Sequence, residues 1–178
     1  MADIKRRNAP PTAATPPPPT GQTPRWTLIE LLFFAYRDFT RDADAVLAQF
    51  GFGRAHHRVL HFVNRNPGLT VADLLDILKI TKQSLARVLK QLIEDGYIEQ
   101  RAGASDRRQR RLFTTERGRE LSFELAARQS LRINGALAAS GAGADAFFHD
   151  ILLAMVNADE RPRVAALTTG RPETGSGQ

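Results

Sequence analysis

Residues 70–118 decide the fold: "TVADLLDILKITKQSLARVLKQLIEDGYIEQRAGASDRRQRRLFTTERG". Thr70 precedes the first apolar segment and has Asp73 three residues later. This is the capping-box arrangement, in which the threonine hydroxyl accepts the third backbone N–H. Thr81 is a cap candidate for a second segment, whose apolar residues follow one helical face: Leu85, Val88, Leu89, Leu92 and Ile93. The sequence therefore predicts two short capped helices joined by a tight turn.

A β-hairpin is predicted directly after the second helix. Residues 97–101 alternate as a strand, residues 103–109 form a loop, and residues 110–114 return as the partner strand. Four arginines lie between Asp106 and Arg111, at the tip and return of this hairpin. A run of like charge is usually a solvated surface. Beside a helix-turn-helix, however, a basic hairpin is the winged-helix arrangement, and it can reach a minor groove whose negative potential attracts arginine.

The helix predicted over residues 82–95 has two chemically different faces. Opposite its apolar stripe and at its N-terminus are the candidate DNA-binding residues Thr81, Lys82, Gln83, Ser84, Arg87 and Lys90. Glutamine can pair bidentately with adenine, and arginine or lysine can reach guanine or a phosphate. N–H groups and hydroxyls at a helix N-terminus suit a backbone phosphate. A solvated face would have the same composition, but the neighbouring hairpin favours DNA binding.

Helical segments flank this region on both sides. The apolar face of residues 25–53 is too broad for a helix that buries one side only. Residues 116–160 hold two helices separated by a Gly-Ala-Gly break. We therefore predict a mainly α fold with a small β-hairpin, in which residues 54–115 form a winged helix-turn-helix domain.

Both ends of the chain are predicted to lack regular structure. Residues 1–24 contain seven of the ten prolines. Helix and sheet are excluded at Pro16–Pro19 because proline has no N–H. We interpret this segment as a disordered spacer, with a basic arm at Lys5–Arg7 as the alternative. Residues 161–178 are predicted to be a flexible tail.

The composition favours an anionic partner and a cytoplasmic protein. The 178-residue chain has a formal net charge of +6 and a pI near 10.4, which suits nucleic acid or an anionic membrane surface. No apolar run of about 18 residues is present, so a membrane span is not expected, and neither is a secretory signal. The absence of cysteine excludes a thiol switch. No nucleophile elbow, phosphate loop, dinucleotide fingerprint or carboxylate pair is present, so an enzyme is not expected.

Residues 70–118 closely resemble the winged-helix core of MarR-type transcriptional regulators. The hallmark consists of Asp106-Arg107-Arg108 in the wing, Thr115 nine residues after the aspartate, and Gly118 three residues further on. The order of helices also matches, so the resemblance covers about residues 26–159.

The family resemblance implies a homodimer that binds a pseudo-palindromic operator in double-stranded DNA. The helical segments outside the winged helix would form the dimerisation region. Arg108 would enter the minor groove with Asp106 as its local partner, while Arg107 and Arg110 would meet phosphates. Family members commonly bind a small ligand between the dimerisation and DNA-binding regions. Residues 50–68 resemble the alphaproteobacterial PetP branch of the family.

Three histidines, His56, His57 and His61, mark a possible effector pocket. His57 and His61 have the i, i+4 spacing that can ligate zinc, but the glutamate of zinc proteases is missing. We interpret the three as surface or pocket-lining residues, with a small-molecule, metal or haem sensor as the alternative, and assign no cofactor. Two other functions stay open: a protein-interaction module on the same scaffold, and a non-specific nucleic-acid binder.

Overall fold

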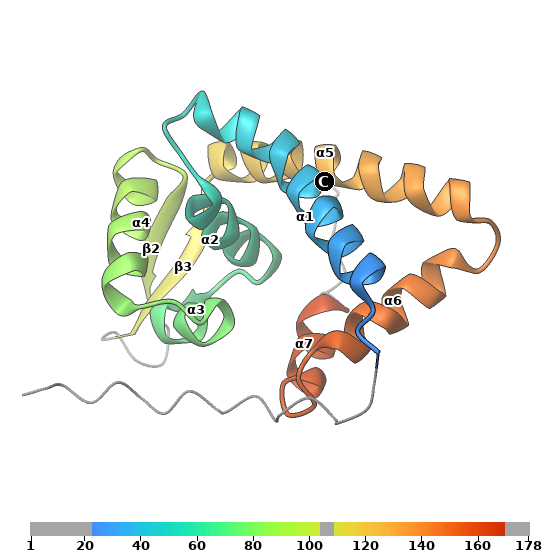
Figure 1. Cartoon of the computed structure of the whole chain (residues 1–178). Coiled ribbons are helices and arrows are strands. Elements are labelled where there is room, and N and C mark those ends of the chain that lie inside the picture. Colours follow the sequence, from blue (N-terminus) through green and yellow to red (C-terminus); the bar gives the residue numbers. More distant parts are fainter. Residues whose placement is uncertain (1–22, 104–108, 170–178) are drawn as a thin grey trace, which may run out of the picture.

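The computed structural model describes residues 23–103 and 109–169. This part of the chain forms α1 (Trp26–Ala48), α2 (Arg54–Arg65), β1 (Leu69–Thr70), α3 (Val71–Leu78), α4 (Lys82–Glu94), β2 (Ile98–Ala102), β3 (Arg110–Thr114), α5 (Glu116–Ser140), α6 (Ala144–Met155) and α7 (Arg161–Thr168). Helices α2 to α4 gather around the strands, while α1, α5, α6 and α7 extend to the other side (Figure 1). The predicted mainly α fold with a small hairpin is confirmed.

Both predicted helix caps of the helix-turn-helix are present. The Thr70 hydroxyl accepts the Asp73 N–H at 3.2 Å, and the Asp73 carboxylate accepts the Thr70 N–H at 2.8 Å, which completes the capping box of α3. At the start of α4, the Thr81 hydroxyl accepts the Ser84 N–H at 3.2 Å. Between the two helices, Lys79 adopts a left-handed conformation with φ of 50° and ends α3. These local interactions define the turn and the direction in which α4 leaves it.

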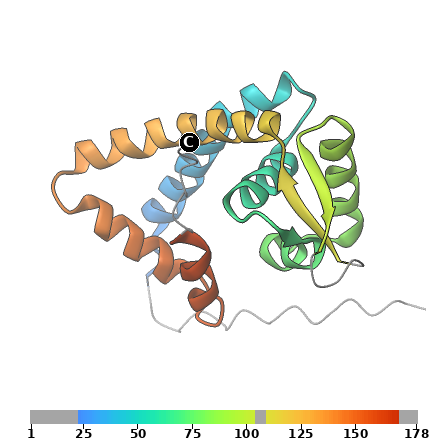
Figure 2. The ribbon, with the colours of Figure 1, turned by 180° about the vertical axis from the view of Figure 1, so that it is seen from behind.

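The predicted hairpin gains a third strand. The antiparallel sheet has the order β1-β3-β2, with Gln100 and Leu69 paired on either side of Leu112. β1 is only two residues long, and the Gly68 N–H extends its pairing by donating to the Leu112 carbonyl at 2.8 Å. Two residues are too few to show an alternating pattern, so this strand was not predicted. Figure 2 shows the strands from behind, beside α3 and α4.

The prediction of a flexible tail over residues 161–178 is wrong for its first part. Arg161–Thr168 forms helix α7, with a proline in its first turn. The Arg161 guanidinium donates to the carbonyls of Ala154 at 2.6 Å and Val156 at 2.9 Å, which ties α7 to the end of α6. No residue of α7 is buried, so the helix has no apolar stripe that sequence periodicity could have revealed. Residues 170–178, and residues 1–22 of the predicted N-terminal spacer, lie outside the described residues.

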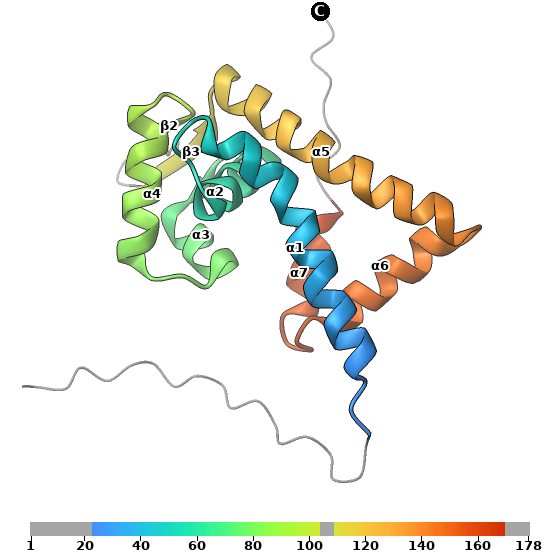
Figure 3. The same cartoon turned by 45° about the horizontal axis from the view of Figure 1, so that its top comes forward.

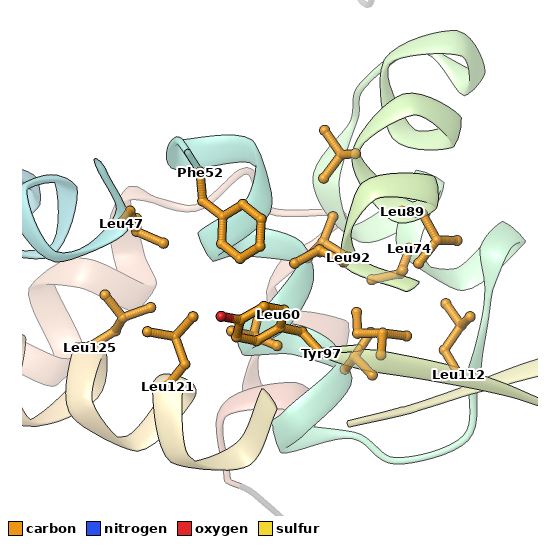
Figure 4. Packing of buried hydrophobic residues seen from close by; sticks show 14 of the residues in the cluster. Leu47, Phe52, Leu60, Leu74, Leu89, Leu92, Tyr97, Leu112, Leu121 and Leu125 are labelled. Atoms are coloured by element: carbon orange, nitrogen blue, oxygen red, sulfur yellow. The ribbon is translucent and has the colours of Figure 1, made fainter. Parts of the chain in front are cut away.

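The core lies where α2, α4, the hairpin and α5 meet (Figure 4). Tyr97 is 2% exposed, and its ring packs edge-on against Phe52 at 5.0 Å between centroids. The Thr115 hydroxyl donates to the Gly96 carbonyl at 2.7 Å and accepts the Gly118 N–H at 3.1 Å. The Thr115-x-x-Gly118 sequence therefore caps α5 and joins it to the turn before β2.

Large apolar side chains outside the core gather on α1 and α6. On α1 they are Trp26, Leu28, Ile29, Leu31, Leu32, Phe33, Phe34 and Tyr36, and on α6 they are Phe147, Phe148, Ile151, Leu152 and Met155. In the part of the chain that the structure describes, no residue of α6 is buried. Figure 3 shows α6 and the N-terminal part of α1 away from the winged-helix domain, whereas the C-terminal end of α1 runs back to α2. Among the described residues, no helix is long and apolar enough to cross a membrane.

Candidate nucleic-acid interface

Helix α4 separates an apolar face from a polar one, as predicted. Leu85, Val88, Leu89 and Leu92 are buried against the core. The residues expected to contact DNA are all exposed: Thr81, Lys82, Gln83, Ser84, Arg87 and Lys90. Because four of them are at the first turn, the helix presents free donors where its dipole favours an anion. Lys90 also lies 3.6 Å from Glu94, one helical turn further on.

Of the four hairpin residues predicted to take part in DNA binding, one, Arg110, lies within the described residues. Arg110 is exposed at the start of β3. The Gly103 N–H donates to the Gln109 carbonyl at 2.9 Å, which closes the hairpin below its tip. The other three predicted wing residues, Asp106, Arg107 and Arg108, lie outside the described residues. Their roles stay predictions.

Arg111 has a structural role, although it belongs to the same run of arginines. It is half-buried, and its guanidinium donates to the Gly68 carbonyl at 3.2 Å. Arg101 pairs with Glu99 and lies over the Phe113 ring at 4.6 Å from the centroid. Within the run, Arg111 therefore stabilises the sheet, whereas Arg110 is exposed.

A pocket of about 270 Å³ lies where α1, α2 and α5 meet. Its lining includes His57 and His61, as the effector-pocket prediction requires. Burial, and secondarily the charge of the other histidine, lowers the pKa of His57. The pKa of His61 is also lowered by burial and, to a smaller extent, by Arg65. Both rings are therefore neutral near pH 7.

The third histidine of the predicted set does not belong to this pocket. His56 stacks on Phe52 at 4.9 Å, and its Nδ1 accepts the Gly53 N–H at 3.1 Å. This leaves the proton on Nε2, which donates to Gln91 Oε1 at 2.9 Å. A rotation of about 100° per residue turns His56 away from its neighbour His57. Within the described residues, no group of three histidine or carboxylate side chains could hold a metal ion.

Comparison with known proteins identifies the family. A MarR family model matches residues 50–109. The HTH-type transcriptional regulator PetP of Rhodobacter capsulatus is 51% identical over 129 residues, which are 72% of this chain and 78% of that protein. The chain belongs to the MarR family of transcriptional regulators. The resemblance to its PetP branch is also confirmed.

Solved structures of MarR family proteins share the fold. The crystal structure of MarR has a TM-score of 0.60 at 21% identity and covers 82% of this chain and 96% of its own. A Mycobacterium tuberculosis MarR family protein in complex with salicylic acid has a TM-score of 0.53 at 24% identity, with 74% and 96% covered. At this identity the likeness concerns the fold alone.

The structure adds pocket residues that sequence reasoning missed in this MarR family chain. Arg54 and Arg58 line the pocket together with His57 and His61. The four positions are spaced i, i+3, i+4 and i+7, which is one face of a helix. That polar stripe is visible in the sequence, because it lies opposite the buried Val59 and Val63 region of α2. The prediction grouped the three histidines because they are close in the sequence, and it therefore missed the two arginines on this stripe.

Proposed function

We propose that this regulator binds a pseudo-palindromic DNA operator as a homodimer in the cytoplasm. Helix α4 would lie in the major groove, and the hairpin would reach the adjacent minor groove. The observation that supports this most directly is the pair Gln83 and Arg87, exposed on α4 opposite its buried face. Both side chains can form bidentate contacts with base edges, and neither makes a hydrogen bond within the described residues that would occupy it.

The exposed apolar faces of α1 and α6 support the homodimer. A monomeric soluble protein rarely exposes so many large apolar side chains on neighbouring helices. In a twofold-symmetric dimer, the apolar face of α1 or α6 would pack against α1 or α6 of the partner subunit and would be removed from water. Two DNA-binding domains would then be held at a fixed separation, which a pseudo-palindromic operator requires.

The α1–α2–α5 pocket supports modulation by a small ligand. It lies at the junction of the extended helices and the winged-helix domain, so an occupant touches both. The M. tuberculosis relative of the same fold was solved with salicylic acid bound. A ligand that fits one arrangement of the two regions better than another would shift the separation of the DNA-binding domains. No catalytic role is proposed.

The test begins with a genome-wide footprint, which supplies the operator duplex. Gln83→Ala and Arg87→Ala should each cost about 1–3 kcal/mol of binding free energy on that duplex and relax its base preference. Arg110→Ala is the contrasting variant. Loss of a phosphate contact should weaken binding to operator and scrambled duplexes alike and lower the salt dependence by about one ion.

Two outcomes would contradict the proposal in different ways. If both α4 variants bind operator and scrambled duplexes as the parent does, α4 does not recognise the sequence, and a non-specific binder remains. If the parent itself binds every duplex weakly and captures no genomic site, the winged helix acts as a protein-interaction module.

A further inference from the structure

The last three helices form an arm that leaves the winged-helix domain and returns to it. α5 starts in the core and continues for 25 residues, which is about 37 Å at a rise of about 1.5 Å per residue. α6 reverses the direction of the chain, and α7 comes back to the side on which α3 lies (Figure 1, Figure 2). The end of this arm therefore lies beside the helix-turn-helix.

Two acidic and two basic side chains join the end of the arm to α3. Lys79 Nζ, just after α3, lies 2.8 Å from the Asp76 carboxylate and 2.9 Å from the carboxylate of Glu160, the residue before α7. Arg163 of α7 pairs with Asp76 and lies 4.0 Å from Glu160. Each acid thus contacts both bases. One exposed ion pair contributes little, but several charges in a network are the exception.

This four-charge network gives a reason for a lysine at the end of α3. Lys79 has a φ of 50°, and it is the one non-glycine residue with a positive φ among those described. Glycine is the usual residue at such a position because it has no Cβ. Hydrogen bonds to Asp76 and Glu160 raise the pKa of Lys79. The hydrogen bond from Lys79, together with the charge of Arg163, lowers the pKa of Asp76, so these groups stay charged at neutral pH.

The position of α7 depends on polar contacts at both of its neighbours. Arg161 joins it to the end of α6 through the carbonyls of Ala154 and Val156. The four-charge network joins it to α3. In the described part of the chain no residue of α7 is buried, so apolar packing alone does not fix this helix. Breaking the network would release the arm from the helix-turn-helix.

We propose that the four-charge network fixes the orientation of the winged-helix domain on the arm and thereby determines which half-site spacing the dimer accepts. Without the network, α1 and α5 alone connect the domain to the dimerisation region, and long helices bend. Lys79 lies two residues before Thr81, the cap of α4, so a bend of the domain moves the recognition helix. The inference rests on the proposed function, because spacing matters only to a dimer that binds two half-sites.

The test exchanges charges without changing their sum. In the arm variant, Glu160→Arg and Arg163→Glu place like charges opposite Lys79 and Asp76. The total charge of the first turn of α7 is unchanged, so its interaction with the helix dipole changes little. The full-reversal variant adds Asp76→Lys and Lys79→Glu, which again places opposite charges together. Recovery in this variant separates the network from the separate effects of the substitutions.

The first measurement requires neither DNA nor a dimer. The chain contains no cysteine, so Gln100→Cys on β2 and Ala139→Cys near the end of α5, both exposed positions, can carry two spin labels. Pulsed electron paramagnetic resonance, with the labelled chain diluted in unlabelled chain, gives the distance between them. The control Glu124→Arg/Arg128→Glu exchanges an ion pair within α5.

The parent, the control and the full-reversal variant should each give one narrow distance distribution, and the arm variant should lose it. An arm variant with the distribution of the parent would overturn the inference. So would a full-reversal variant as broad as the arm variant.

The second measurement compares the footprinted operator with duplexes whose half-sites are one base pair closer or further apart. One base pair moves a half-site by about 3.4 Å and turns it by about 34°. The arm variant should bind the native spacing roughly two- to tenfold more weakly than the parent and lose most of the preference for it. The full-reversal variant should recover both.

A purely structural role of the network predicts an equal loss of affinity on all three duplexes. That result would refute the inference, and so would an arm variant that keeps the spacing preference of the parent. If the parent binds no operator, the proposed function is contradicted, while the distance measurement still decides whether the network fixes the domain.

Discussion

Replacing Gly118 by alanine tests the junction between the hairpin and α5. A Cβ at this position would lie 2.0 Å from the carbonyl oxygen of Tyr97 and 2.9 Å from its carbonyl carbon. Real Cβ atoms essentially never approach within 3.0 Å, so the first turn of α5 must move by about 1 Å or more. The obstacle is backbone, and no flexible side chain can yield. The same oxygen accepts the Thr115 N–H at 3.1 Å, and this bond would be distorted by the shift.

The magnitude follows from three contributions. Overpacking a well-filled site costs about 1–3 kcal/mol, and the damaged hydrogen bond adds about 1 kcal/mol. Alanine returns about 1 kcal/mol through its helix propensity. We expect Gly118→Ala to lower the free energy of unfolding by about 2 kcal/mol, which corresponds to a fall of about 4–8 °C in melting temperature for a chain of this size.

Gly135→Ala is the matched control on the same helix. Among the described residues, its Cβ would meet nothing within 4 Å, so only the propensity gain of about 0.5–1 kcal/mol remains. Urea unfolding followed by far-UV circular dichroism, at one protein concentration, should move the two midpoints in opposite directions. If Gly118→Ala unfolds at or above the midpoint of the parent, the close approach to Tyr97 does not explain why glycine stands there.

Two further predictions concern the dimer and pH. Phe147→Asp should reduce the mass measured by sedimentation equilibrium from twice the 19.7 kDa chain to the single chain, because the loss of this buried ring on both subunits weakens association by roughly 100-fold or more. The control variant Asp150→Asn, on the same helix, should stay dimeric. If Phe147→Asp is also dimeric, α6 is not part of the interface. Burial lowers the folded-state pKa values of His57 and His61 from 6.5. At acidic pH the unfolded chain therefore binds more protons than the folded chain. The free energy of unfolding should fall as the pH drops through 6.5 and become constant below the folded-state pKa values. In the His57→Gln/His61→Gln variant this part of the pH dependence should disappear, and an identical slope would show that other groups cause it.

Local rules were sufficient for the helix-turn-helix. The hydroxyls of Thr70 and Thr81 each accept an N–H group three residues further along the chain. Residue type and spacing along the chain are therefore sufficient to predict these caps. The apolar stripe from Leu85 to Leu92 determines which face of α4 is buried. The exposed face, and with it the candidate DNA contacts, follows by elimination. This is why the α4 part of the candidate site could be predicted residue by residue.

Long-range contacts limited the prediction of the pocket. His56, His57 and His61 look alike in the sequence, yet Gly53 and Gln91 engage the first while the other two face α1 and α5. Distinguishing them requires knowing which helices cover each face of α2. Arg58 could be placed on the same stripe by spacing alone. Its bond to the Leu78 carbonyl spans 20 residues and depends on how α2 crosses α3.

Helix α7 shows the same limit at the other end of the chain. With no residue buried, it is placed by ion pairs: Lys79 lies 2.9 Å from Glu160, and Arg163 pairs with Asp76. Such pairs between partly exposed groups contribute little individually and leave no periodic pattern in the sequence. They nevertheless join the segment after α6 to α3 and to the turn that precedes α4. The turn between α3 and α4 is therefore contacted from two directions, by Arg58 of α2 and by the α6–α7 segment. Its conformation depends on how the winged-helix domain packs against the surrounding helices.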